Sequence, residues 1–69
     1  MKVYEKVREY ITEHGIKQNA IAKKCNISVA TFSAIMNGKR TMYADDFRAI
    51  CIALNVSPEI FIEYEKHSA

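Results

Sequence analysis

The stretch that decides the fold covers residues 18–37 and reads QNAIAKKCNISVATFSAIMN. Its apolar positions recur at helical spacing on both sides of a short turn, and they are Ile21, Cys25, Ile27, Phe32 and Ile35. Asn26 is one of the few non-glycine types that tolerate the positive φ of a tight bend. The Ser28 hydroxyl can cap the helix that follows. The stretch therefore predicts two short helices, about 17–25 and Ser28–Met36, joined by a tight turn.

Three further helices are expected outside this stretch. Apolar residues at helical spacing indicate a helix over residues 3–14, which Gly15 ends as a left-handed C-terminal residue. Phe47, Ile50, Cys51 and Leu54 define a fourth helix, which ends at Asn55. A fifth begins at Ser57-Pro58-Glu59, where a cap, a proline and an acid open a first turn. Strand alternation is not seen anywhere, so the expected fold is all-α, with five helices.

Length and composition favour a binding module. The chain has 69 residues, of which 49% are hydrophobic, and shows no linker or repeat. We therefore expect one domain over residues 1–69, with a core of about 3–65. A chain this short has a thin core and no room for an enclosed active site. No nucleophile, base and orienting group occur together, and no Gly-rich phosphate loop is present, so neither an enzyme, a cofactor nor a small-molecule ligand is expected.

The two cysteines, Cys25 and Cys51, are too few for a disulfide-stabilised secreted domain and favour a reducing, cytoplasmic setting. Both lie at apolar helical positions and are interpreted as small buried hydrophobes rather than as a redox switch. A metal site is not expected, because there is no Cys-x-x-Cys, and His14 and His67 lack ligand spacing. No stretch approaches the ~20 apolar residues of a membrane span.

The charge of the chain is unevenly distributed. Residues 1–40 hold eight Lys or Arg against three Glu, whereas residues 41–69 hold two against five Asp or Glu. No acid occurs from His14 through Ala44, and this segment holds Lys17, Lys23, Lys24, Lys39 and Arg40. A polyanion is therefore attracted to it despite the net charge of +2. A solvated lysine face is the alternative interpretation.

The sequence resembles the helix-turn-helix domain of the phage lambda/434 repressor and Cro type, the XRE-like transcriptional regulators, from about Tyr4 to Phe61. The residues that carry the resemblance are Gln18, Ile21, Ala22, Ile27-Ser28, Thr31, Ser33, Ile35, Asn37-Gly38-Lys39-Arg40, Ile50 and Ala53-Leu54-Asn55-Val56-Ser57. A helix held in this way matches the ~12 Å major groove of DNA. The resemblance implies a DNA-binding transcription regulator, often encoded by a phage or other mobile element.

The resemblance also implies roles for individual residues, with the helix Ser28–Met36 in the major groove. Those facing base edges would be Gln18, Val29, Ala30, Ser33 and Ala34. Those holding backbone phosphates would be Lys17, Gln18, Thr31, Asn37, Gly38 through its amide, Lys39, Arg40 and Tyr43. Phosphate contacts fix the register of the protein on the duplex, and base contacts read the sequence.

The chain departs from the family pattern at several of these positions. Val29, Ala30 and Ala34 are apolar where long polar side chains are frequent. They can touch a thymine methyl but cannot read donors and acceptors, so direct readout falls to Thr31, Ser33 and Gln18. We expect modest specificity, weighted towards thymine and DNA shape.

Helix starts and one charge also depart from the pattern. Lys17 and Ala20 cannot form the capping box usual at the second helix. Tyr43 replaces a small cap before the fourth helix, where Asp45 and Asp46 partly compensate. Met36 replaces a common Glu, which removes a negative charge beside the DNA face.

Two questions stay open at this level. Ile60, Phe61 and Tyr64 form either the apolar side of a helix that closes the core or a dimer surface, and relatives typically bind two half-sites ~34 Å apart as dimers. The leading function is a repressor or Cro-like regulator that occludes a promoter. Its alternative is a protein-interaction module, such as an antirepressor or antitoxin-like adaptor, docking through the apolar recognition helix. Salt dependence of binding distinguishes the two.

Overall fold

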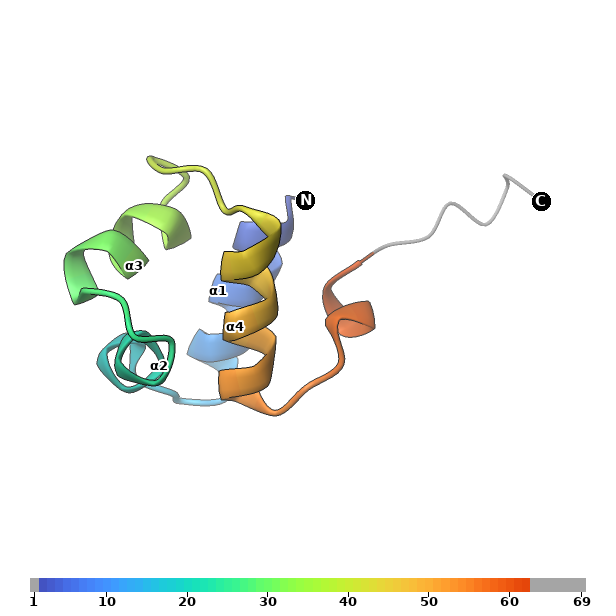
Figure 1. Cartoon of the computed structure of the whole chain (residues 1–69). Helices are drawn as coiled ribbons and strands as arrows, with labels where there is room; N and C mark the ends of the chain where they lie inside the picture. The colour runs from blue at the N-terminus through green and yellow to red at the C-terminus, as the bar shows by residue number, and fades with distance from the viewer. Residues whose placement is uncertain (1, 63–69) are drawn as a thin grey trace.

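In the computed structural model, which describes residues 2–62, four α-helices are followed by one short 3-10 helix (Figure 1). They are α1 (Val3–Glu13), α2 (Gln18–Lys24), α3 (Val29–Met36), α4 (Ala44–Leu54) and η1 (Pro58–Phe61). The described residues contain no strand, so the all-α expectation is confirmed.

The predicted fifth helix is corrected to a single 3-10 turn. Ser57 caps it as expected, with its Oγ accepting from the Glu59 N–H at 3.4 Å. The amides of Ile60 and Ile62 then donate three residues back, both at 3.2 Å, and Ile62 is already extended, at φ −108° and ψ 123°. The segment therefore ends before an α-helical turn is completed. Tyr64, which was assigned to this helix, lies outside the described residues.

The turn chemistry is confirmed at each predicted position. Asn26 has φ 61°, Asn55 has φ 59° and Gly15 has φ 64°. The Ser28 Oγ accepts a hydrogen bond from the Thr31 N–H at 3.1 Å, which caps α3. These residues fix where α1, α2 and α4 end and where α3 begins.

The starts of α1, α2 and α4 lack a side-chain cap, as the sequence indicated for α2 and α4. Lys17 precedes α2 without a capping hydrogen bond, which forgoes about 1 kcal/mol of stability. Tyr43 precedes α4, and the Asp46 Oδ2 accepts from its backbone N–H at 3.1 Å. That bond satisfies one orphan donor and places a carboxylate at the positive end of α4.

The core gathers side chains from all five elements. They are Val7, Ile11, Ile21, Ala22, Phe32, Ile35, Met36, Ile50, Cys51 and Phe61. α3 packs against α2 and α1, α2 also packs against α4, and η1 packs against α1 and α4. In Figure 1, α3 and η1 lie on opposite sides of α4. Burying these side chains contributes about 25 cal/mol per Å² of apolar surface removed from water. This packing holds the inner face of α3 against α2 and α1 and leaves its opposite face exposed.

Phe61 belongs to this core. It is 2% exposed, and its ring packs edge-on against Tyr10 and Phe47, at centroid distances of 5.5 and 6.1 Å. Its neighbour Ile60 is 52% exposed. Of the two residues described in the suggested dimer surface, only Ile60 therefore offers its side chain to a partner.

Candidate nucleic-acid interface

The outer face of α3 is apolar and accessible. Phe32, Ile35 and Met36 are buried, whereas Val29 is 47% exposed and Ala30 is exposed. Ser33 and Ala34 are half-buried, as are Gln18 and Thr31. Because residues three and four apart share a helix face, Val29, Ala30 and Ser33 form one surface. Met36 is fully buried, so the residue that replaces the family's Glu belongs to the core rather than to this surface.

The first turn of α3 is held by paired hydroxyls. The Ser28 Oγ accepts from the Thr31 N–H and lies 2.9 Å from the Thr31 Oγ1, to which it donates. The cap therefore also orients Thr31, a predicted phosphate ligand.

The last turn of α3 is held by α1. The Arg8 Nη1 donates to the Met36 carbonyl at 3.0 Å and to the Asn37 Oδ1 at 3.4 Å. A guanidinium at a helix C-terminus satisfies an orphan carbonyl and favours the helix dipole. Arg8 was not among the residues predicted from the sequence to form the site. The sequence marks Arg8 only weakly as a packing residue. It follows buried Val7 and precedes buried Ile11 by three residues, which places it at the edge of the apolar face of α1.

The side chain of Asn37 is used within the chain. Its Nδ2 donates to the Ser33 carbonyl at 2.9 Å and to the Ser33 Oγ at 3.3 Å, while its Oδ1 accepts from Arg8. The amide nitrogen and the carbonyl oxygen of Asn37 therefore both have partners within the chain. The predicted phosphate bond from this side chain would replace one of these contacts, so we assign Asn37 to holding α3.

Gly38 also has a structural role. It has φ 74°, and a Cβ placed on it would lie 2.5 Å from the Tyr4 phenol oxygen, so only glycine fits without movement. Its N–H, the predicted phosphate donor, donates to the Ile35 carbonyl at 3.1 Å. The amides of Lys39 and Arg40 both donate to the Ala34 carbonyl, at 2.9 and 3.2 Å. The turn is thus closed by backbone bonds, and Lys39 and Arg40 are exposed.

The remaining predicted phosphate ligands lie at helix starts. Lys17 is exposed immediately before α2, whose N-terminus has no side-chain cap. Tyr43 is 65% exposed immediately before α4.

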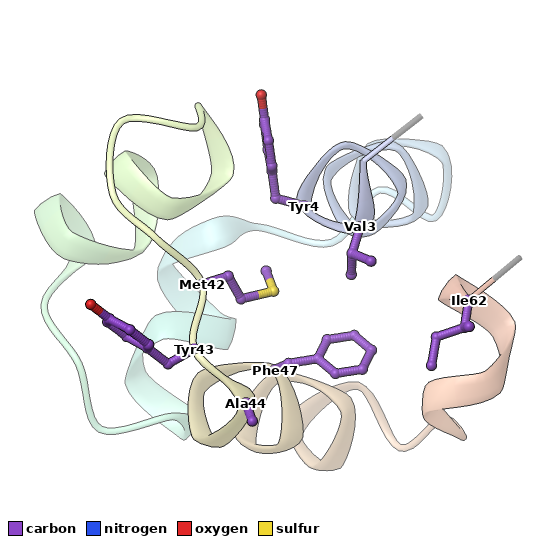
Figure 2. A pocket seen from close by; sticks show the side chains of 7 residues that line it. All are labelled: Val3, Tyr4, Met42, Tyr43, Ala44, Phe47 and Ile62. Carbon is purple, nitrogen blue, oxygen red and sulfur yellow. The ribbon is translucent and has the colours of Figure 1, made fainter.

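Tyr43 also lines an apolar pocket that the sequence did not indicate. The pocket has a volume of about 420 Å³ and is lined by Val3, Tyr4, Met42, Tyr43, Ala44, Phe47 and Ile62. Figure 2 shows Phe47, Met42 and Ile62 along its floor and sides, with both phenol oxygens pointing away from Phe47. No lysine or arginine lines it.

Both thiols are free and are held as thiols. Cys51 is buried and Cys25 is half-buried. Burial raises the pKa of the Cys51 thiol; burial, and next the negative charge of Asp46, raise the pKa of Cys25. Since the thiolate is the reactive form, these shifts suppress cysteine chemistry. Among residues 2–62, no three His, Cys, Asp or Glu side chains group as metal ligands.

Two helices joined by a tight turn, the second with an exposed face beside cations, define a helix-turn-helix DNA-binding module. The family model described as Cro/C1-type HTH DNA-binding domain matches residues 6–67, and the chain belongs to that family. The resemblance stated from the sequence is thereby confirmed. Searches of curated proteins and of solved structures gave no significant match. No helix within the described residues is long and apolar enough to cross a membrane.

Proposed function

We propose that the protein is a sequence-specific transcription regulator of the repressor or Cro-like kind, which acts in the cytoplasm by occluding a promoter. In this proposal α3 lies in the major groove of double-stranded DNA. The observation that carries it is the exposed face of α3, next to the acid-free segment from His14 to Ala44, on a chain of a DNA-binding family. An anionic groove is attracted to that side of the molecule.

Each predicted contact has a part in this proposal. Val29, Ala30, Ser33, Ala34 and Gln18 face base edges, the first two through apolar contact with thymine methyl groups. Lys17, Gln18, Thr31, Lys39, Arg40 and Tyr43 contact phosphates, which sets the register of α3 without reading sequence. Asn37 and Gly38 contribute by closing the turn that presents Lys39 and Arg40.

We further propose that two copies bind together on DNA. One recognition helix seldom supplies enough affinity, and half-sites about one helical turn apart suit a symmetric pair. Exposed Ile60 and Ile62, at 52% and 40%, are apolar groups that a second copy would cover. Analytical ultracentrifugation with and without the selected duplex tests this, and a one-to-one complex on every selected site contradicts it.

The salt dependence of binding tests the proposed function. Neutralising about five phosphates per subunit gives a slope near −0.9 per contact in log K against log salt. Arg40→Ala should flatten that slope by about 0.9 and should weaken binding to all DNA sequences alike. The matched variant Arg48→Ala on α4 should leave both the slope and the affinity unchanged. An interaction module that docks apolar α3 on a protein partner would instead show weak, salt-insensitive binding or no binding to DNA.

A further inference from the structure

Three side chains form a hydrogen-bonded relay behind the outer face of α3. The relay runs from Arg8 on α1 to Asn37 at the end of α3 and on to Ser33, one helical turn back. Arg8 is anchored independently by the Met36 carbonyl at 3.0 Å. The relay thus connects α1 with a residue on the predicted base-reading face of α3.

The chemistry of the partners fixes the orientation of the Asn37 amide. A guanidinium only donates, so the atom 3.4 Å from Arg8 must be the Asn37 oxygen. A backbone carbonyl only accepts, so the atom 2.9 Å from the Ser33 carbonyl must be the Asn37 nitrogen. The two contacts agree, and each excludes the flipped amide.

The hydrogen-bonding sense of Ser33 follows from that orientation. The Asn37 Nδ2 lies 3.3 Å from the Ser33 Oγ and donates to it, so the hydroxyl oxygen accepts a hydrogen bond from within the chain. The hydroxyl proton has no acceptor within residues 2–62. Ser33 is half-buried, so this proton is available on the outer face as a donor.

The neighbours of Ser33 on that face are apolar. Val29 and Ala30 lie four and three residues earlier, both exposed. A single outward donor beside aliphatic groups matches one base edge in the major groove, that of thymine, which presents the O4 acceptor next to a methyl group. Cytosine presents an amino donor at the corresponding place and lacks the methyl.

We propose that the Arg8–Asn37–Ser33 relay sets the Ser33 hydroxyl as a donor and that this hydroxyl reads the O4 oxygen of a thymine, with Arg8 and Asn37 as positioning residues. The inference rests on the proposed function, because it requires α3 in the major groove. It adds that the Ser33 hydroxyl recognises DNA as a hydrogen-bond donor rather than as an acceptor. It also names Arg8 and Asn37 as the two residues that determine this.

The test compares duplexes that differ at one base pair. Selection of bound DNA with the full chain and with Ser33→Ala identifies the base pair whose preference depends on Ser33. The T·A pair there is then exchanged for 5-methylcytosine·G, which keeps the pyrimidine methyl and replaces the O4 acceptor by an amino donor. The exchange also brings the O6 acceptor of guanine on the opposite strand, so the part of the preference that depends on Ser33 is the difference between the wild type and Ser33→Ala. The wild type should favour thymine by about threefold to tenfold, the usual worth of one hydrogen bond, and Ser33→Ala should reduce the ratio to less than about twofold.

Asn37→Asp tests the relay itself. A carboxylate keeps its attraction to Arg8 but only accepts, so it draws the Ser33 proton inward and leaves lone pairs facing the DNA. The thymine preference should be lost or reversed, which a purely structural role of Asn37 would not produce. Asn19→Asp on α2 carries the same charge change and should retain the wild-type ratio.

The outcomes separate the inference from the function on which it rests. If no sequence is enriched by the wild type, the proposed function fails. If a site is selected but Ser33→Ala leaves the ratio unchanged, or Asn37→Asp keeps the same ratio as Asn19→Asp, the inference fails while DNA binding stands. Circular dichroism of each variant confirms that its helices are intact.

Discussion

Gly38 and Gly15 form a matched pair for measuring what the turn after α3 requires. Both have positive φ, 74° and 64°, which costs alanine about 1–2 kcal/mol. A Cβ on Gly15 meets nothing within 4 Å, whereas one on Gly38 lies 2.5 Å from the Tyr4 phenol oxygen and 2.7 Å from its ring carbon. The phenol is the end of a rotatable side chain, so moving it costs about 1 kcal/mol, the lower end of overpacking.

We therefore expect Gly15→Ala to lower the free energy of unfolding by about 1–2 kcal/mol and Gly38→Ala by about 2–3 kcal/mol. The unfolded-state entropy that alanine removes is common to both and cancels in the difference. For a domain of this size each 1 kcal/mol lowers Tm by about 4–8 °C. Urea and thermal unfolding followed by circular dichroism measure both variants.

A Tyr4→Ala background isolates the contact. In that background Gly38→Ala and Gly15→Ala should have equal effects, because the group that the new Cβ meets has gone. Two results would show that the contact between Tyr4 and the turn is assigned wrongly. In one, the two substitutions lower the free energy of unfolding equally in the wild-type background. In the other, the larger loss for Gly38→Ala persists in the Tyr4→Ala background.

Three further predictions concern α1, α2 and the thiols. Arg8→Met should lower the free energy of unfolding by about 1.5–3 kcal/mol, because it removes a charge-assisted bond to the C-terminus of α3; urea titration should show an effect within about 0.5 kcal/mol for exposed Arg48→Met. Lys17→Ser should raise stability by about 1 kcal/mol by capping α2 while weakening DNA binding, and an unchanged affinity would remove Lys17 from the interface. Since the pKa of each thiol is raised, alkylation by iodoacetamide should reach half its maximal rate at a pH above that of a free cysteine, with Cys25 reacting before Cys51; a midpoint at or below it contradicts the assigned burial.

The helix cap and the turn conformations were predicted correctly because they depend only on residues close together in the sequence. The hydroxyl of Ser28 and the positive φ of Asn26, Asn55 and Gly15 concern residues within one turn, and all appear where the sequence placed them. The length of the last helix does not depend on local chemistry alone. The start at Ser57 is the same for an α-helix and a 3-10 turn, whereas the end follows from how Phe61 packs in the core.

The relay behind α3 could not be predicted because its partners are distant and partly backbone. Arg8 and the Met36 carbonyl are 28 residues apart, and a carbonyl acceptor leaves no mark on the sequence. The family resemblance implied a phosphate contact for Asn37, and the structure adds that its amide donates to the Ser33 carbonyl. The prediction of a cationic interface, by contrast, depends on the sequence alone, through the absence of acids between His14 and Ala44.

The most direct test of the account is an NMR titration of the full chain with the duplex that it selects. The account predicts that the largest amide shifts fall on α3 and on residues 37–40, with smaller shifts at the start of α2 and, because two copies are proposed to pair on the duplex, at Ile60 and Ile62. Shifts centred on η1 or on the apolar pocket near Phe47, with α3 unmoved, would contradict the claim that α3 enters DNA.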